Sequence, residues 1–95
     1  MQYRDLIYRI HARQSMFMRS ISDECVEHIV RHGEVIEDYP HAFPFPAKLL
    51  LGSCDGRSIH VVAAENSSKQ LTIVITAYEP TLDKWKPDMK TRRKQ

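Results

Sequence analysis

Two apolar runs flank the dipeptide Asp55-Gly56, and this arrangement constrains the fold more than any other feature of the chain. Asp-Gly favours the tight two-residue turns that join antiparallel strands, because both turn positions need a positive φ. The run before the dipeptide, residues 48–54, and the run after it, residues 57–64, are therefore expected to form a β-hairpin.

Turn signals predict one further strand on each side of this hairpin. A Pro-rich loop at residues 40–46 separates it from residues 34–39, and a polar turn at residues 66–69 separates it from residues 70–78. Because all the connections are short, we expect four antiparallel strands within residues 34–80.

The N-terminal third of the chain has helical spacing. Apolar residues within 3–19 fall on one stripe at 3.6 residues per turn, and neither Gly nor Pro interrupts it. A second helix is expected over residues 22–33, with Ser22 as its N-cap and Gly33 as its stop. Two N-terminal helices packed on one face of a four-stranded antiparallel sheet make an α+β fold. The stripe consists of Tyr3, Leu6, Ile7, Ile10, Phe17 and Ile21.

Alternation along the last two strands predicts which side chains face the helices. In the last strand Thr72, Val74, Thr76 and Tyr78 share one face, and the other face is entirely apolar. His60 belongs to the mixed face of the preceding strand. We expect the apolar sets to face the helices, so that His60, Thr76 and Tyr78 lie on an open face where an extended ligand can bind.

The length of 95 residues and the apolar content of 42% favour a single globular domain, residues 1–95. The longest apolar runs are far short of the roughly 20 residues that cross a bilayer, and the start lacks a secretory signal. We therefore expect a cytoplasmic protein with no membrane segment. In that reducing compartment, Cys25 and Cys54 are expected to be free thiols.

The net charge of +2 is unevenly distributed along the chain. Residues 1–20 and 83–95 are rich in Lys and Arg, whereas residues 22–38 are rich in Asp and Glu. If the two basic ends meet in space, they form a cationic face suited to a polyanion. The alternative is that residues 81–95 are simply a solvated basic tail.

Two histidines favour acid–base chemistry on a phosphodiester. Imidazole titrates near neutral pH and can therefore act as a base or an acid. His11 and Arg13 lie in the first predicted helix, and His60 lies in the middle of a strand. A metal-independent ribonuclease needs a base for the 2′-hydroxyl, an acid for the departing 5′-oxygen and cations for the phosphorane. The alternative is that each histidine is structural, with its ring hydrogen-bonded at the edge of the core.

Metal and nucleotide chemistry have less support. His28 and His32 have the i, i+4 spacing of a zinc site, but Ile29 occupies the place of the metalloprotease glutamate and further ligands are not evident. The chain has three glycines and no Gly-rich phosphate loop. We therefore expect no metal and no other cofactor.

Nine short motifs and residues follow one another along nearly the whole chain, each occurring once: His11-Ala-Arg13, Arg19-Ser-Ile-Ser22, Gly33-Glu-Val-Ile-Glu-Asp-Tyr-Pro40, Leu49-Leu-Leu-Gly52, Gly56-Arg57, Ile59-His-Val61, Ile75-Thr-Ala-Tyr-Glu-Pro80, Trp85 and Arg92-Arg93. Together they resemble a family of small bacterial proteins defined only as a domain of unknown function and grouped with RelE-, MqsR- and BrnT-like toxins. The resemblance implies a RelE-like fold, similar to that of barnase-type ribonucleases.

The resemblance also implies a function. It suggests the toxin component of a type II toxin-antitoxin system, which cleaves RNA, with ribosome-bound mRNA as a candidate substrate and a zinc-finger or helix-turn-helix antitoxin as partner. Carried onto this chain, it implies His11 and His60 as the proton-transfer pair and Tyr78 as an auxiliary donor. A non-catalytic RNA- or protein-binding module is the alternative. The implied phosphate contacts are Arg13, Arg19, Arg92 and Arg93.

Overall fold

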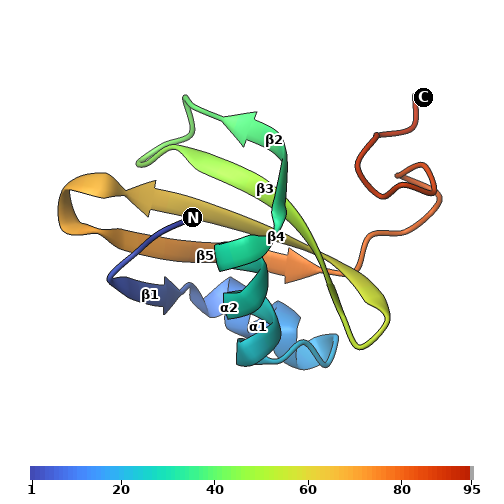
Figure 1. The fold of residues 1–95 in the computed structure, drawn as a ribbon, viewed down its shortest axis with the longest axis horizontal. Coiled ribbons are helices and arrows are strands. Elements are labelled where there is room, and N and C mark those ends of the chain that lie inside the picture. The colour runs from blue at the N-terminus through green and yellow to red at the C-terminus, as the bar shows by residue number, and fades with distance from the viewer. Residues whose placement is uncertain (95) are drawn as a thin grey trace.

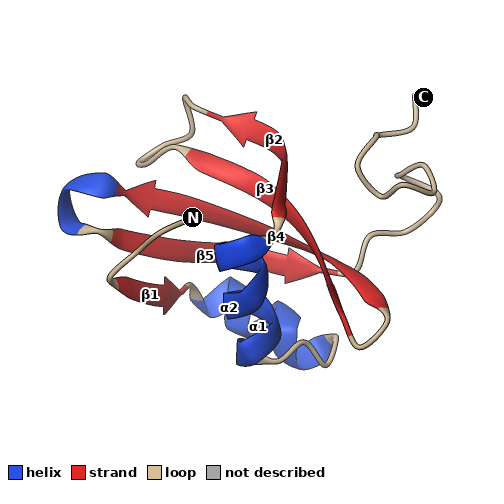
Figure 2. Cartoon of the chain, in the orientation of Figure 1, coloured by secondary structure: helices blue, strands red, loops and turns tan. Residues whose placement is uncertain are grey.

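The computed structural model describes residues 1–94, which form a mixed five-stranded sheet and two α-helices (Figure 1, Figure 2). The strand order across the sheet is β1-β5-β4-β3-β2, with β1 parallel to β5 and the other pairs antiparallel. The elements are β1 (Asp5–Tyr8), α1 (Ile10–Met18), α2 (Asp23–His32), β2 (Glu34–Tyr39), β3 (Ala47–Cys54), β4 (Arg57–Asn66), a 3₁₀ turn (Ser67–Lys69) and β5 (Leu71–Tyr78).

The α+β class was predicted correctly, but the four-stranded antiparallel sheet is wrong, because residues 5–8 form an additional strand instead of the start of a helix. This strand, β1, runs parallel to β5, with Tyr8 opposite Val74. Leu6 and Tyr8 pack against the core, and the residues between and before them are exposed. Four residues satisfy a period of two as easily as a period of 3.6, so the partner strand decides the conformation.

Helix α1 is shorter than the predicted helix over residues 3–19, and it buries a different face. Ala12 and Met16 pack into the core, whereas Ile10 and Phe17 of the predicted stripe are 78% and 85% exposed. Neither this helix nor any other within residues 1–94 has the length and apolar character needed to cross a membrane.

The connection between the two helices is fixed at both ends. Ser20 adopts a left-handed φ of 55° and donates to the Phe17 carbonyl. Ile21 then donates to the Met16 carbonyl at 2.9 Å, which completes a Schellman motif at the end of α1. Ser22 caps α2 as predicted, because its hydroxyl oxygen accepts a 3.1 Å hydrogen bond from the first turn of that helix.

The predicted hairpin is confirmed, with Cys54 opposite Arg57 across the turn. Asp55 and Gly56 have positive φ values of 51° and 76°. The expectation of free thiols is wrong, because Cys25 of α2 and Cys54 of β3 form a disulfide with their Cα atoms 5.9 Å apart. Packing of α2 against β3 and β4 brings these two positions, 29 residues apart in sequence, within bonding distance.

A β-bulge at Ile75 changes which side chains of β5 face the helices, because this residue has no direct partner in β4. Val74 before the bulge and Ala77 after it both belong to the core on the helix side. The prediction that Val74 shares a face with Tyr78 is therefore wrong. Tyr78 and His60 are direct cross-strand partners, as their predicted common face requires.

The residues after β5 loop beside the end of the sheet at which β5 ends (Figure 1), and they contact β4 through Trp85 and His60 and β2 through Arg92 and Glu37. Trp85 is only 2% exposed and pairs with Arg92 in a short antiparallel bridge. Of the predicted tail over residues 81–95, Gln95 lies outside the described residues. Residues 81–94 are called the C-terminal segment below, and they supply one side of the candidate site.

Candidate functional site

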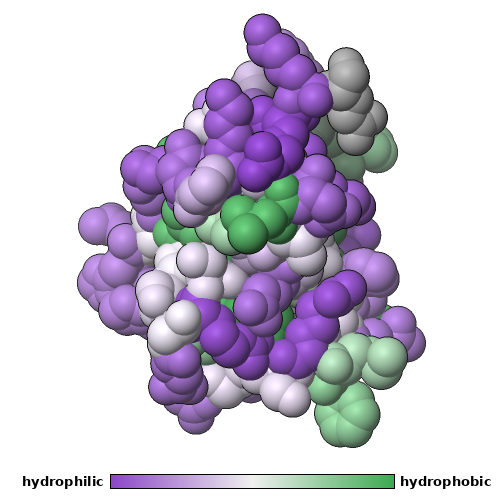
Figure 3. All heavy atoms as spheres, turned by 90° about the vertical axis from the view of Figure 1, so that its right-hand side faces the viewer, coloured by the Kyte–Doolittle hydropathy of each residue, from purple (hydrophilic) through white to green (hydrophobic). Residues whose placement is uncertain are grey.

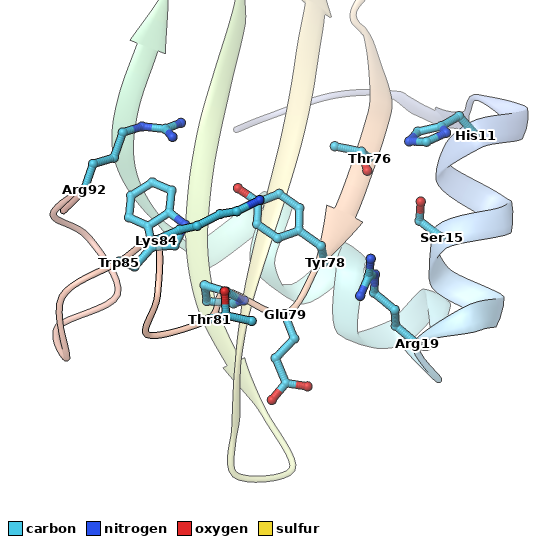
Figure 4. A pocket seen from close by; sticks show the side chains of 11 residues that line it. His11, Ser15, Arg19, Thr76, Tyr78, Glu79, Thr81, Lys84, Trp85 and Arg92 are labelled. Carbon is cyan, nitrogen blue, oxygen red and sulfur yellow. The ribbon is translucent and has the colours of Figure 1, made fainter. Parts of the chain in front are cut away.

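A pocket of about 420 Å³ opens where α1, the end of β5 and the C-terminal segment meet. Figure 4 shows residues of α1 on one side, residues of the C-terminal segment on the other, and Tyr78 between them. The end of the molecule that carries the C-terminal segment has a largely hydrophilic surface (Figure 3). The lining residues are His11, Ser15, Arg19, Thr76, Tyr78, Glu79, Pro80, Thr81, Lys84, Trp85 and Arg92.

The α1 wall consists of His11, Ser15 and Arg19, which share a helix face because they are spaced four residues apart. The neighbouring face of α1, with Ala12 and Met16, is buried and holds the helix in place. β1 pairs only with the first half of β5, so the helix that follows β1 packs alongside the second half. His11 and Arg19 are exposed and can therefore meet a ligand in the pocket.

Tyr78 is joined to His60 at the back of the pocket. The Tyr78 hydroxyl lies 3.1 Å from His60 Nδ1, and His60 Nε2 lies 2.7 Å from the Met89 carbonyl oxygen. A carbonyl oxygen can only accept, so Nε2 carries the proton of the neutral ring and Nδ1 accepts from the Tyr78 O–H. The remaining lone pair of the Tyr78 oxygen is then available to a ligand.

His60 is fully buried, which corrects the expectation that it lies on an open face. The C-terminal segment covers it: the Trp85 ring stands edge-on to the imidazole, with centroids 4.5 Å apart. Burial lowers the pKa of His60, and the hydrogen bond to the Met89 carbonyl opposes this shift. His60 is not among the lining residues, so the structure connects it to the pocket only through Tyr78.

The far wall of the pocket carries a braced cation. Arg92 forms a bidentate ion pair with Glu37 of β2, at 2.7 and 3.0 Å, and its guanidinium lies over the Trp85 ring, 4.6 Å from the centroid. The Arg92 hydrogen bonds lower the pKa of the Glu37 carboxyl. Burial raises the pKa of Tyr78, against the opposing effect of the Arg92 charge.

Two further cations of the pocket have no acidic partner within residues 1–94. These are Arg19 and Lys84, neither of which takes part in an ion pair there. The one carboxylate of the lining, Glu79, lies 3.4 Å from Arg57. The pocket therefore has an excess of positive charge and is suited to an anionic ligand.

The structure brings together only some of the predicted site residues. His11, Arg19, Tyr78 and Arg92 line the same pocket. Arg13 instead forms a 2.6 Å ion pair with Asp23 and lies over the Tyr8 ring. Arg93 donates to carbonyls within the C-terminal segment, where it holds the backbone.

Sequence reasoning missed Lys84 and Glu79 as lining residues. From the sequence, Lys84 was considered only as part of the positive charge of the tail. Trp85, which directly follows Lys84, was the available signal that this part of the tail is ordered, because a large aromatic side chain is usually buried. The rings of His28 and His32 lie side by side on α2, with centroids 5.1 Å apart and a tilt of 48° between them. Within residues 1–94 no group of three or more potential metal ligands is present.

The fold and the pocket define a small α+β protein with a cationic site between its first helix and its last strand. Residues 8–79 match the family described as Domain of unknown function (DUF4258), which is more than half of the chain. The protein belongs to this family, and the predicted membership of a domain-of-unknown-function family is thereby confirmed. Comparisons with curated proteins and with solved structures gave no match.

Proposed function

We propose that this protein is a metal-independent endoribonuclease that acts as the toxin of a type II toxin-antitoxin system. The observation that supports cleavage of RNA is the single pocket in which His11, Tyr78, Arg19 and Lys84 meet. It offers groups for proton transfer next to cations without an acidic partner within residues 1–94. The resemblance to RelE-like toxins, stated above from the sequence motifs, is the basis for the toxin assignment.

In the proposed reaction, Tyr78 and His60 act together as the base. The ribose 2′-hydroxyl gives its proton to the Tyr78 oxygen, while the Tyr78 proton moves to His60 Nδ1. The tyrosine stays neutral throughout, which suits its raised pKa. Burial disfavours the imidazolium formed at His60, and the hydrogen bond from its Nε2–H to the Met89 carbonyl offsets part of this cost while the proton is held there.

His11 completes the transfer as the acid. The 2′-oxygen attacks phosphorus, the bond from phosphorus to the 5′-oxygen breaks, and protonated His11 supplies the proton to that oxygen. The products are a 2′,3′-cyclic phosphate and a free 5′-hydroxyl. Arg19, Lys84 and Arg92 contact the phosphate and stabilise the charge that builds up on it.

The test is cleavage of a defined RNA, with and without ribosomes, in the presence of EDTA. His11→Ala and Tyr78→Phe are each expected to reduce the rate by about 10²–10⁴-fold, the usual contribution of a positioned acid or base. His28→Ala, an exposed histidine on α2, is the matched control and should cleave like the wild type. Failure of the wild type to cleave under either condition, or equal cleavage by His11→Ala, would refute the proposal.

A second candidate, a protein-binding module, is favoured by the exposed apolar side chains of α1. Ile10, Phe17 and Met18 are 78%, 85% and 80% exposed. Such a face suits a protein contact, for which a DNA-binding protein encoded beside this chain is the proposed partner. Expression of the chain alone and together with its neighbour distinguishes the candidates: growth arrest that the neighbour relieves supports the toxin, and growth unaffected in both cases supports a module without toxicity.

A further inference from the structure

Arg57 joins two elements that shape the pocket, α1 and β5, although it does not line the pocket itself. Its guanidinium donates to the backbone carbonyls of Arg19, at 3.0 Å, and Ser20, at 3.3 Å. Its Nε lies 3.4 Å from a carboxylate oxygen of Glu79. Arg19 and Glu79 are lining residues, so one side chain connects the end of α1 with the end of β5.

These contacts fix the direction in which Arg19 leaves the helix. The last carbonyls of a helix lack intrahelical partners and carry partial negative charge, so a guanidinium is a favourable partner for them. Ser20 additionally holds a left-handed φ of 55°, a conformation that a residue with a Cβ adopts at some cost. Arg57 stabilises this turn from outside the helix and thereby positions Arg19.

The disulfide in turn holds Arg57. Cys54 is the direct cross-strand partner of Arg57, and its bond to Cys25 ties the hairpin to the start of α2. α2 begins directly after the turn that contains Ser20. The hairpin and the helix connection are thus locked together beside the Arg57 contacts. Cys54 is partly exposed, and both cysteines border a small hollow of about 60 Å³ on the surface.

We infer that Arg57 is a positioning residue for the pocket and that the Cys25–Cys54 disulfide makes this positioning sensitive to redox state. A dithiol reductant opens the bond: it loses two electrons and two protons and forms its own disulfide, and both cysteines become thiols. The hairpin is then free of α2, Arg57 loses its fixed place, and the end of α1 loosens. The inference rests on the proposed function in taking RNA as the ligand of the pocket.

The experiment uses the full chain, oxidised or reduced with dithiothreitol, with the number of free thiols counted in each state. Two properties are measured: the affinity for a short fluorescent RNA, and the hydrogen exchange of the Ser20 and Ile21 amides compared with the Val61 amide in the core. We expect reduction to weaken RNA binding and to speed exchange at Ser20 and Ile21 more than at Val61. Arg57→Ala in the oxidised protein should weaken RNA binding by about tenfold, the effect of losing a charged hydrogen bond.

Two further variants separate positioning from general destabilisation. Arg57→Lys keeps the charge but not the forked contact, and it should weaken binding less than Arg57→Ala. Arg4→Ala removes an exposed arginine that is ion-paired to its neighbour, and it should leave binding unchanged. In Arg57→Ala, reduction should add no further loss.

The outcomes distinguish this inference from the proposed function. If the oxidised wild type does not bind RNA but exchange at Ser20 responds to reduction and to Arg57→Ala, the proposed function fails and the positioning role stands. If RNA is bound and cleaved equally in both redox states and by Arg57→Ala, the positioning role fails and the proposed function stands. Unchanged exchange at Ser20 and Ile21 in a fully reduced protein also overturns the inference.

Discussion

Burial of His60 under the C-terminal segment makes the stability of the protein depend on pH in a defined direction. Burial lowers the pKa of His60 in the folded state, whereas the unfolded chain has the ordinary value near 6.5. Below pH 6.5 the unfolded state therefore binds the proton more readily than the folded state. Stability falls as the pH drops from 6.5 toward the folded pKa, and it is unaffected by this group above about pH 7.5.

The size of the effect follows from the linkage relation. One proton bound only in the unfolded state costs about 1.4 kcal/mol per pH unit below the unfolded pKa. Between pH 7.5 and pH 5.5 the free energy of unfolding should fall by up to about 1.4 kcal/mol because of His60. His60→Gln removes the titrating group and should remove this part of the pH dependence, whatever it costs in stability at pH 7.5.

Unfolding by guanidinium chloride at the two pH values measures this effect. Trp85 is the single tryptophan of the chain and lies against His60, so its fluorescence follows the C-terminal segment directly. The comparison is between the wild type, His60→Gln and the matched control His28→Gln, whose imidazole is exposed. The control should lose as much stability as the wild type. Equal losses in the wild type and in His60→Gln would refute the reasoning, because the buried imidazole would then not be the group that resists protonation.

Three further changes probe the fold. Reduction of the Cys25–Cys54 disulfide, which closes a separation of 29 residues, should lower the free energy of unfolding by about 3.6 kcal/mol; a change of the denaturation midpoint within error would contradict this. Gly52→Ala places a Cβ against Cγ1 of Ile29 and should lower the free energy of unfolding by about 1–3 kcal/mol, and by less when it is combined with Ile29→Ala. Strictly additive losses in denaturant titrations would argue against this contact. Ser20 has a left-handed φ of 55°, which glycine adopts without a Cβ clash, so Ser20→Gly should increase the free energy of unfolding by about 1 kcal/mol and raise the thermal midpoint. A lower midpoint would show that the φ of Ser20 does not strain the turn.

Local chemistry was sufficient to predict the parts of the fold in which neighbouring residues decide the conformation. The two-residue turn at Asp55 and Gly56 requires positive φ at both positions, and few other dipeptides tolerate this. Ser22 is followed by acidic residues that suit the start of a helix, so the beginning of α2 was also evident.

The elements that were missed depend on contacts between distant parts of the chain. Residues 5–8 become a strand because Leu71 and the residues after it form a sheet edge with which they pair. The sequence pattern within residues 5–8 holds no information about this distant partner. The bulge at Ile75 was hidden because both faces of β5 are partly buried, so a shift of one residue does not expose an apolar side chain.

The same limit applied to the candidate site. Tyr78 and His60 were placed together correctly because strand alternation is a local property. The burial of His60 depends on Trp85 and Met89, which follow β5 in a segment that has no regular pattern to predict its path. The disulfide depends on the packing of α2 against the hairpin and was equally out of reach.

The C-terminal segment completes a site that the family match covers only in part. His11, Arg19 and Tyr78 lie within the matched residues 8–79, whereas Lys84 and Arg92 lie beyond them. The segment also sets the chemistry of the matched part, because its Met89 carbonyl and Trp85 ring bury His60 and hold it in the tautomer that accepts the Tyr78 proton. The groups proposed to transfer protons and the cations of the far wall are thus carried by separate stretches of sequence. Changes within residues 81–94 at positions that do not touch His60 should therefore alter which anion binds while leaving the Tyr78–His60 hydrogen bond intact.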